Sequence, residues 1–331
     1  MTQQKTLETL GASWTMTTLL ITHPAFLEHD TGPAHPERAD RMRAIDKVLV
    51  HESYNALKRA EAPLRVDVEE EILRVHPSDH LDRIKGSAEL LKKRDGSLRI
   101  DTDTVMSLGT YEAALRAVGA GLDAVDEVMT GRVANAFCQV RPPGHHAEND
   151  RAMGFCLFSN AAIAAHYARV RHGAERIAVV DFDVHHGNGT QDIFWSDKNM
   201  FYGSTHQMPL FPGTGALSET GVGNIWNAPL REGDSGETFR EAFTSRIMEP
   251  LHNFGPDLIV ISAGFDAHKR DPLGGLRLVE ADFIWATEAL GKAAHSHCKG
   301  RMVSMLEGGY DLDALAKSVA VHVRTLMDLG S

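Results

Sequence analysis

Residues 176–190 read RIAVVDFDVHHGNGT, an apolar run that changes within one residue to acidic and histidine side chains. The first part, Arg176–Val180, has the continuous aliphatic composition of a strand buried on both faces of a parallel sheet. In the second part, Asp181, Asp183 and His185 occupy alternate positions, which in extended backbone point to one side. The stretch therefore predicts a buried strand that presents polar side chains at its carboxyl end.

The same succession of apolar run, polar glycine-containing loop and helical pattern recurs along the chain. Further buried strands are predicted at four apolar runs: Thr17–Thr22, Ala136–Val140, Asp257–Ser262 and Arg301–Leu306. Helices are predicted where apolar residues recur at helical spacing: Thr110–Thr130, Ser159–His172, Glu237–Phe254, Val279–His297 and Asp311–Leu329. Strands that alternate with helices indicate one α/β domain, whose parallel sheet is covered by helices on both faces.

Length and composition exclude several classes of protein. The chain has 331 residues, of which 43% are hydrophobic, as in ordinary globular proteins. No apolar run reaches the roughly 18–20 residues of a membrane-spanning helix, so we expect no membrane partner. The net charge of −11 argues against a nucleic-acid partner and suits a cationic substrate. The start of the chain lacks a secretory signal pattern, and three cysteines cannot form a disulfide framework, which predicts a reduced, cytoplasmic protein.

The unusual residues of the chain follow its predicted strands, where open parallel sheets bind their ligands. Besides the loop after Val180, three loops carry polar residues beside glycines: Arg141–Ala147, Ala263–Ala267 and Glu307–Tyr310. Each of them directly follows a predicted strand. Four strand ends can therefore bring polar side chains to one rim of the sheet.

Two of these loops contain the elements of a metal site. Asp183 and His185, with a carboxylate from another strand end such as Asp266, make a set of one histidine and two carboxylates. Three protein ligands leave positions open for water and substrate, as in catalytic metal sites. Zn²⁺, Fe²⁺ and Mn²⁺ all accept such ligands. A loop with capping carboxylates and a solvated histidine pair would explain the same residues, and the motif alone does not separate the two interpretations.

The other two loops contain groups that can act on a substrate. His145 and His146 form an adjacent pair, and a neutral imidazole near a metal-bound water can serve as a general base. Tyr310 follows two glycines, and its phenol can donate a hydrogen bond to a developing oxyanion. Taken singly, the histidines would also suit an exposed turn, and the tyrosine a packing role.

Together, these motifs resemble those of the zinc-dependent histone deacetylase family, and look most like its class II branch and the bacterial deacetylases grouped with it. The resemblance covers nearly the whole chain, because further motifs occur in the right order: Thr22–Pro24, His35–Arg38, Gly154–Cys156, Phe211–Gly215 and Asp271–Gly275. It implies an arginase/deacetylase-like fold with a central, mostly parallel sheet of about eight strands. It also implies that residues 1–15 are an N-terminal extension and that residues 16–331 form a single deacetylase domain.

The resemblance implies a role for each matching residue. The implied metal ligands, for Zn²⁺ or alternatively Fe²⁺, are Asp183, His185 and Asp266. The implied catalytic groups are His146 as general base and then general acid, His145 with its partner Asp181, Asn188 behind His146, and Tyr310 as oxyanion donor. The implied substrate-binding residues are the tunnel residues Gly154, Phe155, Phe211 and Leu273, Arg38 at the inner end, and Asp103 at the rim. A structural K⁺ ion would bind the backbone of Asp181, Asp183 and His185, together with Ser204 and Thr205.

The implied reaction is hydrolysis of N-acetyl-lysine side chains in peptides or proteins, with release of acetate. Class I relatives carry aspartate at the position of Asn188, which leaves the protonation of the histidine pair open. Tyr310 is retained where some class II relatives have histidine, so ordinary acetyl amides are expected substrates. Leu273 stands where polyamine-specific relatives have glutamate, which favours acetyl-lysine over acetylated polyamines. An acetylpolyamine amidohydrolase and a non-catalytic acyl-lysine binding protein remain the alternatives, and a homo-oligomer is compatible with all three.

Overall fold

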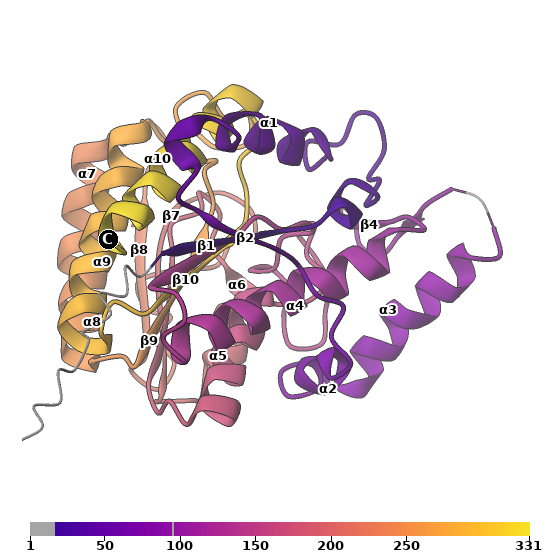
Figure 1. The fold of residues 1–331 in the computed structure, drawn as a ribbon, viewed down its shortest axis with the longest axis horizontal. Helices are drawn as coiled ribbons and strands as arrows, with labels where there is room; N and C mark the ends of the chain where they lie inside the picture. Colours follow the sequence, from indigo (N-terminus) through magenta and orange to yellow (C-terminus); the bar gives the residue numbers. More distant parts are fainter. Residues whose placement is uncertain (1–16, 95) are drawn as a thin grey trace, which may run out of the picture.

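A sheet of eight parallel strands forms the centre of the protein (Figure 1). The computed structural model describes residues 17–94 and 96–331. The strand order is β2-β1-β5-β10-β9-β6-β7-β8, and every pair of neighbouring strands runs parallel. The bounds are β1 Thr18–Thr22, β2 Lys58–Glu61, β5 Asn135–Cys138, β6 Ile177–Asp181, β7 Met200–Gln207, β8 Ile225–Leu230, β9 Leu258–Ala263 and β10 Met302–Leu306. A short antiparallel pair, β3 Leu98–Arg99 and β4 Val105–Met106, lies outside this sheet.

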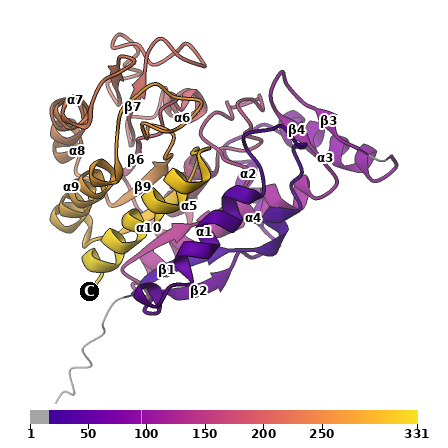
Figure 2. The same ribbon diagram turned by 90° about the horizontal axis from the view of Figure 1, so that it is seen from above.

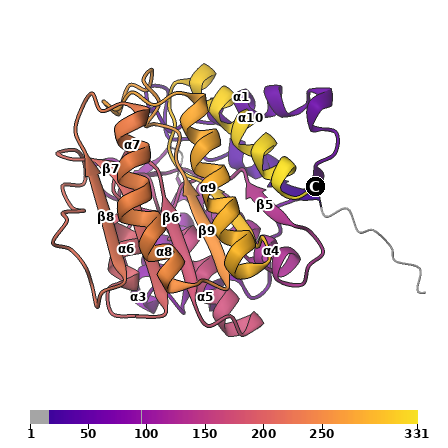
Figure 3. The same ribbon diagram turned by 90° about the vertical axis from the view of Figure 1, so that its left-hand side faces the viewer.

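Helices cover both faces of the sheet. One face packs against α4 (Thr110–Met129) and α5 (Asn160–His172), and the short α6 (Asn188–Phe194) lies beside β7. The other face packs against α9 (Glu280–Cys298) and α10 (Leu312–Leu329), which Figure 3 shows in front of the strands. The remaining helices are α1 Asp40–Leu49, which lies beside α10 in Figure 2, α2 Val68–Ile72, α3 Ser78–Leu91, α7 Gly236–Ala242 and α8 Glu249–Phe254, with short 3₁₀ turns at Pro24–Leu27 and Glu52–Tyr54.

The predicted fold class is confirmed, and the five predicted strands and the helices near 110–130, 159–172, 279–297 and 311–329 occur within one or two residues of their expected bounds. The sequence pattern missed β2, β7 and β8, because their residues are largely polar or, in β8, include a proline. The helix predicted over Glu237–Phe254 also occurs. Its α7 and α8 parts are joined without a break by a π-helical segment, Phe243–Met248, which the sequence pattern did not predict. The predicted extension, residues 1–15, lies outside the described residues.

The order of the strands explains how the motifs meet. The strands that precede the four polar loops are adjacent in the sheet, in the order β5-β10-β9-β6. Every residue of these four strands is buried, so their aliphatic side chains fill both sides of the core. Because parallel strands end at the same edge, their carboxyl-terminal loops converge there. Within the described residues, no helix is long and apolar enough to cross a membrane.

A buried ion-pair network ties the amino-terminal part of the chain to this edge. Glu37 accepts hydrogen bonds from Arg41 at 3.0 Å and from Arg141 at 2.5 and 2.8 Å, and all three side chains are fully buried. Arg41 in turn donates to the backbone carbonyls of Gly309 and Glu307. One carboxylate therefore holds two arginines, and one of them, Arg41, links it to the loop after β10.

We predict that Glu37→Ala lowers the free energy of unfolding by about 3–5 kcal/mol, because it leaves two buried guanidinium groups without their counter-ion. Urea denaturation followed by circular dichroism measures this change. Glu89→Ala is the control, since Glu89 and its partner Lys92 lie in an exposed pair on α3. Equal stabilities of the two variants would contradict the structural role of Glu37.

Candidate active site and metal centre

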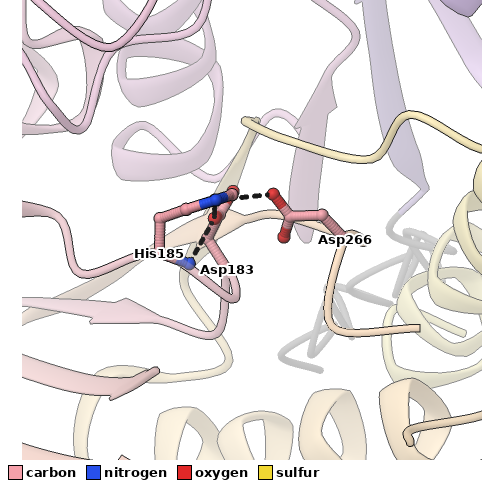
Figure 4. A group of neighbouring side chains, drawn as sticks. All are labelled: Asp183, His185 and Asp266. Atoms are coloured by element: carbon pink, nitrogen blue, oxygen red, sulfur yellow. Dashed lines mark hydrogen bonds and ion pairs between the residues drawn. The ribbon is translucent and has the colours of Figure 1, made fainter. Parts of the chain in front are cut away.

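Asp183, His185 and Asp266 meet at the carboxyl edge of the sheet (Figure 4). Asp183 and His185 lie in the loop after β6, and Asp266 lies in the loop after β9. One ligand atom from each residue lies within 4.8 Å of the others. The Nδ1 atom of His185 is 3.1 Å from Asp183 Oδ1 and 3.1 Å from Asp266 Oδ2, and all three residues are buried. The structure thus brings together three side chains that follow two different strands.

The electrostatics of this cluster fit a divalent cation. Burial raises the pKa of Asp266, and the neighbouring charge of Asp183 raises it further. Burial lowers the pKa of His185, but its hydrogen bonds to the two carboxylates outweigh this effect and raise the pKa above its usual value. The raised pKa of His185 favours its positively charged form, and the raised pKa of Asp266 favours its uncharged form. Both shifts reduce the uncompensated negative charge of the cluster. A bound cation would supply the same positive charge, and oxygen and nitrogen donors of this kind suit Zn²⁺ or Fe²⁺.

Two glycines allow the backbone to close around the carboxylates. A Cβ atom on Gly264 would lie 2.0 Å from Asp183 Oδ2, and one on Gly308 would lie 2.1 Å from Asp266 Oδ2. In this space Gly308 N donates to Asp183 Oδ2 at 2.8 Å, and Val184 N donates to Asp266 Oδ1 at 2.8 Å. Backbone donors therefore fix both carboxylates, which explains why glycine follows β9 and β10 at these positions.

The two adjacent histidines have opposite electrostatic environments. His145 Nδ1 lies 2.9 Å from Asp181 Oδ2, which also accepts a hydrogen bond from Tyr202 at 3.0 Å. Burial lowers the pKa of His145, but the charges of Asp181 and Asp183 raise it well above its usual value. Burial and the charges of His145 and His185 hold the pKa of His146 well below its usual value. The two shifts favour the protonated form of His145 and the neutral form of His146.

A narrow pocket of about 290 Å³ leads to this edge. Its lining residues are Asp103, His146, Gly154, Phe155, His185, Leu210, Phe211, Leu273 and Tyr310. The Phe211 ring lies 5.1 Å from the His146 ring, and the Phe155 ring lies 6.0 Å from the Tyr310 ring. Sequence reasoning missed Leu210, although it directly precedes the Phe211 motif. The pocket has largely apolar walls and polar groups at its inner end.

The loop of Tyr310 is held by the carboxylate of Asp271, which belongs to the motif Asp271–Gly275 but was not predicted as a site residue. Asp271 Oδ2 accepts hydrogen bonds from Tyr310 N at 2.6 Å and from Asp311 N at 3.3 Å, while Oδ1 accepts one from Leu273 N at 3.0 Å. Asp271 thereby ties the tyrosine loop to the tunnel wall. Burial raises the pKa of the Tyr310 phenol well above its usual value, so the phenol keeps its proton and can donate it in a hydrogen bond.

The prediction that Arg38 lies at the inner end of the site is wrong. Arg38 is exposed and its Nε atom lies 3.4 Å from Asp40 Oδ2 at the surface. Arg41 takes the inner position, with its guanidinium carbon 5.1 Å from the centre of the Tyr310 ring. The physical reason is the start of α1 at Asp40: Arg38 lies before the helix and turns to solvent, whereas Arg41 lies in its first turn and faces the core.

Other predicted residues lie close to the cluster. Asn188, the first residue of α6, has its Oδ1 atom 2.8 Å from His146 Nδ1. Ser204 lies opposite Asp181 in the register of β7 and β6, and the next residue is Thr205. Among the described residues, the buried Thr205 hydroxyl has no hydrogen-bond partner. Glu307, which was not predicted as a site residue, accepts hydrogen bonds from Gly144 N and His145 N at 2.7 and 3.1 Å.

We predict that Asp266→Ala loses the bound metal and keeps the fold. Open three-ligand sites usually fail when one ligand is removed, and the variant also removes a carboxylate that Asp183 repels. Elemental analysis after dialysis against zinc should show about one ion per chain in the wild type and almost none in the variant. Asp313→Ala, at an exposed carboxylate on α10, is the control and should retain the metal. Full retention in Asp266→Ala would exclude this residue as a ligand.

Comparison with known proteins relates this chain to deacetylases. Residues 35–326 match the family described as histone deacetylase domain. A probable deacetylase of Archaeoglobus fulgidus is 37% identical over 305 residues, which cover 90% of this chain and 82% of that protein. A histone deacetylase-like amidohydrolase of Pseudomonas aeruginosa is 38% identical over 291 residues, which cover 86% of this chain and 75% of that protein.

A solved structure shares the whole architecture. The crystal structure of the HDA15 HD domain has a TM-score of 0.88 and 36% sequence identity to this chain, and the match covers 95% of this chain and 89% of that one. The family match extends from the residues before α1 into α10 and includes every motif of the site. The chain therefore belongs to the histone deacetylase family.

Proposed function

We propose that this protein is a zinc-dependent deacetylase that hydrolyses N-acetyl-lysine side chains of peptides or proteins and releases acetate. The observation that carries the proposal is the inner end of the 290 Å³ pocket, where His146, His185 and Tyr310 line one space. A neutral base, a metal ligand and a protonated phenol are groups that metal-dependent amide hydrolysis can use at one carbonyl carbon. A module that only bound acyl-lysine would not need them.

A zinc ion held by Asp183, His185 and Asp266 would polarise the acetyl carbonyl and lower the pKa of a water molecule beside it. The side chains of the protein perform the remaining steps. His146 accepts a proton from the attacking water and later donates it to the leaving amine. His145 remains an imidazolium, and Tyr310 donates a hydrogen bond to the carbonyl oxygen as it becomes negative. We also propose that Thr205, with the backbone beside Asp181, contributes to a structural K⁺ site, which would satisfy its unpartnered hydroxyl.

The walls of the pocket support a lysine side chain as substrate. Phe155, Phe211, Leu210 and Leu273 are apolar and suit the four methylene groups of the lysine stem. A secondary ammonium within the same stretch would lose its hydration next to Leu273 without gaining a counter-ion. This difference favours acetyl-lysine over acetylated polyamines. Cys138, Cys156 and Cys298 are free, buried thiols, which suits the cytoplasm as the proposed compartment.

We predict that Tyr310→Phe lowers kcat on an acetyl-lysine peptide by about 10²–10³ and changes KM by less than about threefold, because the phenol acts on the transition state. Steady-state kinetics of the zinc-loaded variant measure both constants. Tyr111→Phe removes a phenol that pairs with Glu69 on the outside of α4, and it should leave both constants unchanged. If kcat of Tyr310→Phe stays within about twofold of wild type, Tyr310 has no role in catalysis.

We predict that the wild type hydrolyses an acetyl-lysine peptide with a higher kcat/KM than acetylspermidine, and that Leu273→Glu shifts this ratio toward acetylspermidine. A carboxylate at the tunnel wall would pair with the internal ammonium of the polyamine. Leu273→Gln is the matched control, since it has the size of glutamate without its charge. A wild-type preference for acetylspermidine, or equal ratios for the Glu and Gln variants, would favour the polyamine hydrolase alternative or another determinant of selectivity.

A further inference from the structure

The orientation of one amide group decides whether His146 can act as a base. Asn188 can turn either its oxygen or its nitrogen toward His146 Nδ1. If the oxygen faces the ring, Nδ1 carries the proton and Nε2 keeps a lone pair. If the nitrogen faces the ring, Nδ1 accepts a hydrogen bond and the neutral ring carries its proton on Nε2. Only the first arrangement leaves Nε2 able to accept a proton from water.

The surroundings of Asn188 select the first arrangement. Its Nδ2 atom lies 2.7 Å from Glu148 Oε1 and 3.3 Å from the Met153 sulfur. An ionised carboxylate and a thioether can only accept hydrogen bonds, so the two N–H groups of the amide must point toward them. The amide oxygen then lies 2.8 Å from His146 Nδ1, which must donate. The neutral form of His146 therefore carries its proton on Nδ1.

We propose that Glu148 is the positioning residue that fixes the tautomer of His146 through the amide of Asn188. This inference rests on the proposed function in one respect, that His146 is the general base. The Glu148 carboxylate also polarises the amide, which makes its oxygen a better acceptor for the His146 N–H group. Glu148 thus supplies, one residue further away, part of the negative charge that a neutral amide at position 188 lacks.

The backbone holds Glu148 and Asn188 at a fixed separation. Glu148 N donates to Arg151 O at 2.9 Å within its own loop, and the adjacent Asn149 N donates to Asp192 on α6 at 2.9 Å. On the other side, Gly189 N donates to His145 O at 3.0 Å. A Cβ atom at Gly189 would lie 2.1 Å from the carbonyl oxygen of Ala147, so only glycine permits this approach. The contact between the carboxylate and the amide is therefore built into the packing of two segments.

A double-mutant cycle tests the proposal. In the wild-type background, Glu148→Ala should lower kcat on an acetyl-lysine peptide about tenfold, the usual effect of losing a hydrogen-bonded partner behind a functional histidine. In the Asn188→Asp background, either carboxylate oxygen can accept from Nδ1, so the same change should alter kcat less than about twofold. Asp150→Asn removes a charge from the same loop without touching Asn188, and it should leave kcat unchanged in both backgrounds.

Nitrogen NMR of the histidine rings gives a measurement that does not depend on activity. In the wild type, the ring signals of His146, assigned from their loss in His146→Gln, should show a protonated Nδ1 and an unprotonated Nε2. In Glu148→Ala, a population with the proton on Nε2 should appear. Glu148→Leu keeps most of the volume of the side chain and has no acceptor for the amide, so it replaces the alanine variant if the latter does not fold.

The outcomes distinguish a failure of the proposed role of Glu148 from a failure of the proposed deacetylase function. Equal losses of kcat from Glu148→Ala in both backgrounds, or a His146 ring that stays protonated on Nδ1 in Glu148→Ala, would overturn the role of Glu148. If the wild type hydrolyses no acetylated substrate, the proposed function fails, and the NMR result alone decides whether Glu148 sets the tautomer.

Discussion

Two carboxylates buried side by side are the constraint on which the rest of the site depends. Asp183 and Asp266 lie at the ends of β6 and β9 without exposure to solvent, so their charge must be balanced within the protein. Backbone N–H groups, the His185 ring and the imidazolium of His145 supply part of that balance. Glycines after β9 and β10 provide the necessary space. A catalytic cation completes the arrangement in the proposed function.

The same charges give the histidine pair its division of roles. His145 lies next to carboxylates and stays protonated, and its positive charge then lowers the pKa of His146. Tyr310 remains a neutral donor because burial raises the pKa of its phenol by more than the nearby charge of Arg41 lowers it. His145, His146 and Tyr310 thus share a small space, and the two histidines differ in their favoured protonation because their neighbours differ. In the proposed function, this arrangement supplies a base and a proton donor from ordinary side chains.

Sequence reasoning could predict what depends on local pattern. The apolar run before Asp181 and the alternation of Asp181, Asp183 and His185 predicted a buried strand and a set of ligands, because burial and strand periodicity are local properties. It could not place Arg41 or Glu148. The start of α1 decides whether Arg38 or Arg41 turns inward, and the partner of Asn188 depends on how the loop after β5 packs on α6. Such contacts join residues far apart in the chain and leave no periodic signal.

The central claim is that a metal at Asp183, His185 and Asp266 is required for hydrolysis of an acetyl amide. The most direct test removes all metal with a chelator and titrates the protein with Zn²⁺ while acetate release from an acetyl-lysine peptide is measured. We expect no turnover in the stripped protein and a rise that saturates at about one Zn²⁺ per chain. Full turnover in the stripped protein, or no turnover at any zinc concentration, would contradict this claim.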